Sequence, residues 1–162
     1  MSKVTPCLWF DGNAEEAADF YVSLMPDSRI QKVQRNVIDN PSGKAGSVLV
    51  VEFTLGGQRF VALNGGMKME YTHAISLQID CADQAEVDRI WDAFLTHGGK
   101  AEQCGWLKDR YGVSWQVVPR ALLQFLASSD TAGAQRAVAA MMKMVKLDVD
   151  RLRQAFEGKS AV

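Results

Sequence analysis

The sequence predicts an α+β fold in which one unit of strand, helix and further strands is used twice, followed by a helical extension. A short apolar strand, a turn and an amphipathic helix open the chain, and the same order of elements restarts near residue 75. Like residues recur at one constant offset between the two stretches: Leu8 and Leu77, Phe10 and Ile79, Asp11 and Asp80, Asp19 and Asp88. A repeat of this kind indicates one supersecondary unit used twice.

Composition limits the protein to one domain, or one domain with an appendage. Of the 162 residues, 48% are hydrophobic, which is enough for a proper core. A net charge of −1 favours neither a nucleic acid nor an acidic membrane surface as partner. The sequence shows neither a signal peptide nor an apolar run long enough to span a bilayer. Three cysteines without CxxC spacing indicate reduced thiols and a cytoplasmic location.

The first module is expected to cover residues 1–66. Its predicted elements are a strand at 6–10, a helix at 14–25 and strands at 28–37, 47–55 and 60–63. Asn13 is the expected N-cap of the helix, and Pro26 ends it. Gly56 and Gly57 predict the hairpin turn between the last two strands.

The second module is expected at residues 67–120 and the helical extension at residues 121–162. The predicted elements are a strand at 75–79, a helix at 84–97, extended segments at 100–104 and 105–107, a strand at 113–118, and helices at 131–144 and 149–156. Asp83 and Asp148 are the expected N-caps of two of these helices. Asp109 and Gly112 supply the chemistry of a tight turn before the strand at 113–118.

That strand carries a polar residue at its centre. Ser114, Gln116 and Val118 share one of its faces, because side chains alternate along a strand. A glutamine in such a place needs a polar neighbour, a ligand or water. Gln116 therefore either faces a binding site, or faces solvent or bonds a neighbouring strand.

Two motifs and a C-terminal stretch resemble a known family. The first is Pro6-x-Leu8-x-Phe10-Asp11-Gly12, followed by Ala14-Glu15-Glu16-Ala17-x-x-Phe20-Tyr21. The second is Trp106-x-x-Asp109-x-Tyr111-Gly112-x-x-Trp115-Gln116-x-x-Pro119, and the third is Met141-Met142-x-Met144-x-Lys146-Leu147-Asp148. Together they resemble the vicinal oxygen chelate superfamily, and within it the PhnB-like branch that is often labelled 3-demethylubiquinone-9 3-methyltransferase-like.

The resemblance implies paired βαβββ modules, the glyoxalase/bleomycin-resistance/dioxygenase fold, with a small-molecule cavity and usually a dimer. Whether the modules pair within one chain or between two chains stays open. In the tail, Val138, Met141, Met142, Val145 and Leu147 are too apolar to stand alone in water. They either pack on their own module or cover a partner subunit, and we expect a homodimer.

Metal-dependent members of the superfamily hold a divalent cation with His and Glu side chains from four strands. Carried over to this chain, the four positions fall on Pro6, near Asn64, on Ala74 or His73, and on Gln116. This set lacks the carboxylate that attracts a dication, so we expect no bound metal.

The methyltransferase label can be compared with the glycine pattern. Gly56-Gly57 and Gly65-Gly66 lie in a turn and after a strand, and no G-x-G precedes a helix. The sequence therefore does not support an S-adenosylmethionine site, and we expect no cofactor.

The sequence leaves the function open between three hypotheses. The first is an enzyme, or former enzyme, of the glyoxalase fold that acts on a small organic molecule without a tightly held metal. In it Gln116 and Ser76 orient a polar substrate group, Asn64 bonds beside them and Trp106 forms an apolar wall. The second is a dimeric protein that sequesters a hydrophobic compound without catalysis, as bleomycin-resistance proteins do. The third is a structural or regulatory dimer; Glu52, His73 and Cys104 are left without assigned roles.

Overall fold

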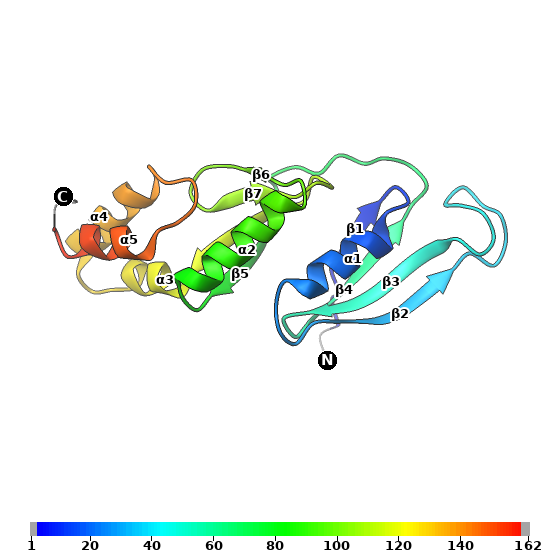
Figure 1. Cartoon of the computed structure of the whole chain (residues 1–162), viewed down its shortest axis with the longest axis horizontal. Coiled ribbons are helices and arrows are strands. Elements are labelled where there is room, and N and C mark those ends of the chain that lie inside the picture. Colours follow the sequence, from blue (N-terminus) through cyan, green and yellow to red (C-terminus); the bar gives the residue numbers. More distant parts are fainter. Residues whose placement is uncertain (1–2, 160–162) are drawn as a thin grey trace. The chain divides into compact units, whose positions relative to one another are not determined.

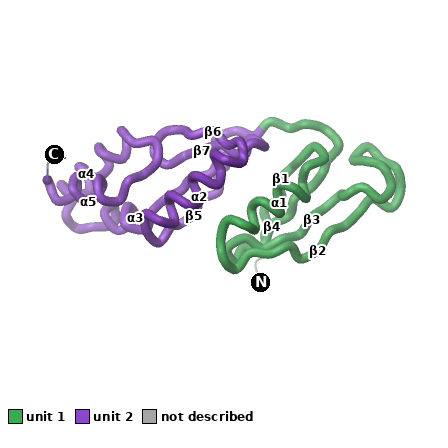
Figure 2. Tube along the Cα trace, viewed as in Figure 1, with its two compact units in different colours: residues 1–70 green, residues 71–162 purple. Residues whose placement is uncertain are grey.

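A computed structural model describes residues 3–159 of the chain. The chain divides into two compact units, unit 1 at residues 1–70 and unit 2 at residues 71–162 (Figure 2). The described residues form two four-stranded sheets and five helices, one sheet in each unit, which confirms the α+β class with repeated modules. None of the described helices is both long and apolar enough to cross a membrane.

Unit 1 is a four-stranded sheet with one helix on one face (Figure 1). Its elements are β1 (Cys7–Phe10), α1 (Ala14–Ser23), β2 (Arg29–Arg35), β3 (Val48–Leu55) and β4 (Gln58–Asn64). The strand order is β1-β4-β3-β2, with β1 parallel to β4 and the other pairs antiparallel. The two outer strands, β1 and β2, are therefore the edges of this sheet.

Helix α1 lies close to the sheet because small residues line its inner face. Ala14, Ala17 and Ala18 are completely buried, and the ring of Tyr21 packs near Phe53 of β3. The prediction that Asn13 caps α1 is wrong, since its side chain makes no capping hydrogen bond.

Unit 2 repeats the plan of sheet and covering helix. Its sheet elements are β5 (Leu77–Cys81), α2 (Gln84–Thr96), β6 (Lys100–Ala101), β7 (Trp106–Lys108) and β8 (Ser114–Pro119). The order is β5-β8-β7-β6, with β5 parallel to β8. The predicted cap of α2 is confirmed, because the Asp83 carboxylate accepts the Glu86 N–H.

The side chains of β8 alternate between the two faces of this sheet as predicted. Trp115 is 1% exposed and its ring lies 5.0 Å from that of Phe94 on α2. Ser114 and Gln116 consequently belong to the opposite face, which we call the open face of unit 2.

The C-terminal extension is part of unit 2. It comprises α3 (Arg120–Leu126), α4 (Thr131–Met141) and α5 (Val149–Phe156), and Asp148 caps α5 as predicted. A core cluster joins the extension to the end of β8: Val118, Leu122, Met144, Leu147 and Leu152. Of the two alternatives for the apolar tail, packing on its own module therefore accounts for the buried Leu147, whereas Met142 and Val145 stay exposed.

Candidate functional site

Three of the four predicted pocket residues lie together in unit 2. Gln116 pairs in register with Trp106 of β7, so both side chains belong to the open face. The Gln116 amide nitrogen donates a 2.9 Å hydrogen bond to the Ser76 hydroxyl just before β5. Gln116, Trp106 and Ser76 are all half-buried. They present a polar pair beside a large aromatic side chain.

A second polar pair, His73 and Glu102, lies beside Trp106 and was not expected from the sequence. His73 Nε2 lies 2.8 Å from a carboxylate oxygen of Glu102, and the His73 ring centroid lies 6.0 Å from that of Trp106. Glu102 comes into place because its N–H donates to the Trp106 carbonyl at the β6–β7 turn. Gly105 indicates a turn that brings Glu102 close to Trp106. Nothing in the sequence indicates that His73 lies beside Glu102.

Ser114 adds an unusual hydroxyl to the open face. Its Oγ is the buried side-chain N or O atom, among the residues described, that has no hydrogen-bond partner. The residue itself is 1% exposed. Buried polar atoms nearly always have partners in proteins, so a lone hydroxyl marks a place where a donor or acceptor would be stabilised.

One carboxylate, that of Asp109, organises the motif around residue 109. Asp109 is 5% exposed and accepts hydrogen bonds from the backbone N–H groups of Tyr111 and Val113. Its other oxygen accepts a 2.9 Å bond from the Trp115 indole N–H. Asp109 thus fixes the turn and the start of β8, and through them the position of Gln116.

Asn64, the fourth predicted pocket residue, belongs to unit 1 and has both ends of its amide occupied there. Its Oδ1 accepts a 3.0 Å bond from the Ala14 N–H at the start of α1, and its Nδ2 donates to the Val48 carbonyl. The side chain is 3% exposed and lies on the helix-covered face of the sheet. Asn64 therefore caps α1 in place of Asn13.

The residues that the sequence left without assigned roles have identifiable partners. Glu52 accepts hydrogen bonds from Arg59 and Gln34 across the sheet of unit 1, and the Arg59 guanidinium lowers the pKa of this carboxyl. The Cys104 N–H donates to the Met144 carbonyl and so ties the loop before β7 to the extension. Burial raises the pKa of the Cys81 thiol to about 12, which makes that thiol unreactive at neutral pH.

The residues present do not fit the divalent cation that the fold family implies. Within the described part of each unit, no three His, Cys, Asp or Glu side chains lie close enough together to hold a metal ion. Of the positions carried over from the family, Gln116 bonds Ser76 and Asn64 caps a helix. Neither side chain supplies the negative charge that such an ion needs.

Comparison with known proteins identifies the family. The family model described as 3-demethylubiquinone-9 3-methyltransferase matches residues 2–118. The chain belongs to this family. The match includes both sheets and ends at β8, so residues 119–162, with the extension, lie outside it.

Solved structures agree with the family assignment. The PhnB protein of Bacillus cereus, which is named after the same methyltransferase, is 35% identical with a TM-score of 0.65, covering 73% of this chain and 99% of its own. A Pseudomonas aeruginosa protein, PA1353, is 19% identical with a TM-score of 0.59 and coverages of 74% and 98%. The fosfomycin resistance protein FosX of Listeria monocytogenes is 11% identical with a TM-score of 0.50 and coverages of 74% and 93%, and it supports the fold alone. The chain is thus a PhnB-like member of the vicinal oxygen chelate superfamily. No functionally curated protein matches it.

Proposed function

We propose that this PhnB-like protein binds a small organic molecule on the open face of unit 2, without a resident metal ion. The observation that carries the proposal is the Gln116–Ser76 hydrogen bond beside the half-buried ring of Trp106. An amide, a hydroxyl and an aromatic surface in one place match the usual make-up of a small-molecule site, a few polar groups on an apolar wall.

Ser114 lies on the same face, two residues from Gln116, but its hydroxyl is buried, so contacts to a ligand fall to the half-buried and exposed polar side chains of this face. Gln78 of β5 pairs in register with Gln116 and widens the polar row toward the edge of the sheet. The ligand that fits is therefore a flat or aromatic molecule with at least two polar atoms, stacked against Trp106.

Ligand screening by thermal shift, followed by calorimetric titration of the hits, tests the proposal. Gln116→Leu should weaken binding by about tenfold or more, because it removes a hydrogen bond and leaves the Ser76 hydroxyl without its donor. Gln135→Leu is the matched control, since Gln135 is exposed on α4 away from this face. Equal binding by both variants would refute the site.

Elemental analysis tests the proposed absence of a resident metal ion. Protein dialysed without chelator should contain well under one equivalent of nickel, zinc, manganese or iron per chain, and chelator should leave its melting temperature unchanged. A stoichiometric metal in elemental analysis would contradict the proposal, because the site would then hold an ion that Gln116 and Asn64 cannot attract.

Catalysis is the second candidate, and the His73–Glu102 pair favours it. An imidazole hydrogen-bonded to a carboxylate is an arrangement that can take up and release a proton beside a bound substrate. The matching assay is a turnover screen with dicarbonyls, epoxides and catechols. Activity that is lost in His73→Gln and kept in His97→Gln would establish an enzyme. Background rates for every substrate would leave a binding protein that sequesters its ligand, as proposed above.

We also propose that the protein acts as a homodimer in the cytoplasm. The sheets end in edge strands, β1 and β2 in unit 1 and β5 and β6 in unit 2, and uncovered edges invite pairing with another strand. Large apolar side chains stay exposed on the extension: Leu123, Leu126, Met142 and Val145. Cys7, Cys81 and Cys104 are free thiols, which supports a reducing compartment.

A further inference from the structure

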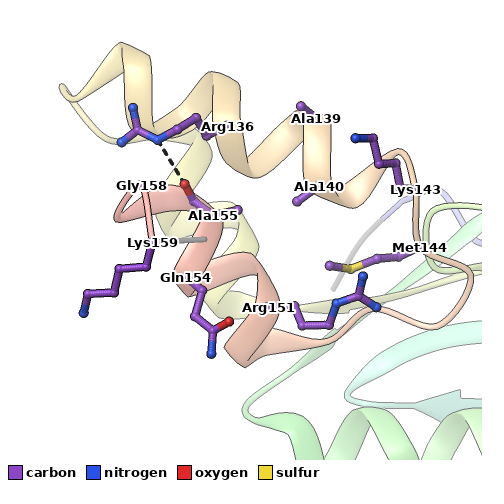
Figure 3. A pocket seen from close by; sticks show the side chains of 10 residues that line it. All are labelled: Arg136, Ala139, Ala140, Lys143, Met144, Arg151, Gln154, Ala155, Gly158 and Lys159. Atoms are coloured by element: carbon purple, nitrogen blue, oxygen red, sulfur yellow. Dashed lines mark hydrogen bonds between the residues drawn. The ribbon is translucent and has the colours of Figure 1, made fainter. Parts of the chain in front are cut away.

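The C-terminal extension contains a groove that the proposed function does not use. A cavity of about 370 Å³ lies between α4 and α5, and all the residues that line it fall between Arg136 and Lys159 (Figure 3). The family match ends at residue 118, so this cavity belongs wholly to the part of the chain outside it. Its volume is within the range of small-molecule sites.

The groove joins an apolar floor to a cationic rim. Ala140, Met144 and Ala155 contribute apolar surface from α4, the following turn and α5. The four charged side chains that line the cavity are all cations: Arg136, Lys143, Arg151 and Lys159. In Figure 3 the Met144 side chain lies between those of Lys143 and Arg151.

Two of these cations have no partner among residues 3–159, the described part of the chain. Arg136 donates to the Ala155 and Phe156 carbonyls and lies 4.0 Å from the Asp130 carboxylate, and Lys159 pairs with Glu157. Lys143 and Arg151 make no side-chain hydrogen bond or ion pair with any residue that the structure describes.

The position of Arg151 sharpens this observation. Arg151 lies in the first turn of α5, where the helix dipole disfavours a cation, and the neighbouring Asp150 pairs with Arg153 instead. An anion beside Lys143 and Arg151 would give both side chains an acceptor.

A second hollow in unit 2 shows that this charge pattern is not general. A cavity of about 540 Å³ is lined by residues of α2, α3 and α5, and its charged residues are mixed in sign: Asp83, Arg120, Asp150 and Arg153. There, Arg153 and Asp150 form an ion pair with each other. That hollow has no excess of positive charge for an anion, whereas the groove between α4 and α5 does.

We propose that the groove between α4 and α5 binds a small amphiphilic carboxylate. Lys143 and Arg151 hold the carboxylate, and an aliphatic chain lies along Ala140, Met144 and Ala155. Arg can bond both carboxylate oxygens at once, and the Met thioether adapts its shape to a flexible chain. The site is separate from the residues of the proposed function, because none of its lining residues comes from β5–β8.

Calorimetric titration of the full-length protein with decanoate tests this proposal, with decanol as the ligand that lacks the charge and acetate as the one that lacks the chain. We expect decanoate to bind with one molecule per chain and the other two to bind much more weakly. The double variant Lys143→Gln/Arg151→Gln should weaken decanoate binding by about tenfold or more. Arg29→Gln/Lys32→Gln removes the same charge from exposed positions of β2 and should leave binding unchanged.

The floor of the groove has an independent variant. Ala140→Phe fills the space beside Met144 and should abolish decanoate binding while the groove's cations remain. Gln116→Leu should bind decanoate as tightly as the unaltered chain, because Gln116 lies outside the groove. The groove and the proposed ligand site on the open face are therefore tested by separate variants, and one proposal can fail without the other. Equal affinity for decanol and decanoate, no measurable decanoate binding, or equal losses in the two charge variants would each overturn the proposal.

Discussion

Asn64 links the end of β4 to the start of α1 through a single amide. Its Oδ1 takes the place of an N-cap acceptor for the Ala14 N–H, and its Nδ2 holds the Val48 carbonyl at the start of β3. Asn64 is 3% exposed and the Ala14 N–H is buried with it, whereas the Val48 carbonyl is partly buried. The amide therefore satisfies backbone groups that would otherwise be buried without partners.

Asn64→Ala should consequently lower the free energy of unfolding by about 1–3 kcal/mol, because it leaves a helix N–H and a strand carbonyl unpaired. Urea unfolding at neutral pH measures the loss. Asn13→Ala is the control, and it should change stability by less than about 0.5 kcal/mol, since Asn13 makes no capping bond. Equal losses in the two variants would mean that Asn64 does not act as the cap.

The sequence predicts the role of a residue better when its partner is a near neighbour in the chain than when its partner is distant. Asp83 and Asp148 cap helices that begin at the next residue, and both were predicted from local pattern alone. Asn64 and the His73–Glu102 pair depend on contacts between residues far apart in the chain, which only the packing of helix on sheet or the pairing of strands brings about. Residue pattern carries no direct signal for such contacts.

At the scale of elements, Gln84 fastens the extension to the start of α2. Its Nε2 donates to the Leu147 carbonyl, and its Oε1 accepts the Val149 N–H at the first residue of α5. The backbone of Cys104 and Gly105 adds bonds to the carbonyls of Met144 and Val145. The segment before α5 is thus held by hydrogen bonds on two sides.

Gln84→Ala should loosen this segment without unfolding the sheet. Hydrogen exchange should become faster in residues 144–152, while β8 keeps its protection, because the core of the sheet does not depend on Gln84. Gln135→Ala, at an exposed position of α4, should leave exchange unchanged. Unaltered exchange in the Gln84 variant would show that the buried Leu147 and Leu152 hold the extension alone.

Charge adds a pH-dependent contact between the same elements. The Lys146 ammonium lies 2.8 Å from the Asp88 carboxylate on α2, and this bond, followed by one from Gln84, lowers the pKa of Asp88. A carboxyl whose pKa is lower in the folded protein stabilises the fold above its unfolded pKa. That contribution disappears as the pH falls below about 4 through the folded pKa.

Asp88→Asn should therefore lower stability at pH 7 by no more than about 1 kcal/mol, since the pair is partly exposed, and the difference from the unaltered chain should shrink at pH 3. Urea unfolding at the two pH values measures both effects. Asp92→Asn is the control, because Asp92 lies farther from Lys146, at 3.6 Å. A difference that grows in acid would contradict the assigned direction of the pKa.

The local sequence pattern predicted the ends of one helix of the extension but not those of another. The helix at 149–156 was predicted to the residue, whereas the helix expected at 131–144 ends at Met141. Met144 and Leu147 follow the end of α4, are 3% and 1% exposed, and pack with Val118 and Leu122 in the core cluster. Burial of these side chains outweighs helix propensity at the end of α4.

At the scale of the whole molecule, the repeat predicted two modules, and each unit contains one of them. The sequence could not show that the extension and the second module form one compact unit, because that union depends on a core cluster drawn from β8 and three later segments. The alternation along β8 predicted which of its residues share the open face. The neighbouring pair of His73 and Glu102 could not be predicted, because it too depends on a contact between distant segments.

The extension gives the last prediction, which concerns folding and assembly together. Truncation after Asp130 removes Met144, Leu147 and Leu152 from the core cluster and uncovers Val118 and Leu122. Losing several buried aliphatic side chains costs several times the 2–5 kcal/mol of one large-to-alanine change, about as much as the whole stability of a domain. We therefore expect the truncated chain to aggregate or fail to fold, and circular dichroism and light scattering would show this.

The full-length chain should instead scatter light as a particle of twice its 17.8 kDa at micromolar concentration, as proposed from its edge strands and exposed apolar side chains. Met142→Lys/Val145→Lys separates the two roles of the extension, because both side chains are exposed and lie outside the core cluster. A folded monomer from this variant would place the dimer contact on the extension, and a dimer would place it on the strand edges. A full-length chain that stays monomeric at every concentration would contradict the dimer and leave the extension as a cover for its own unit.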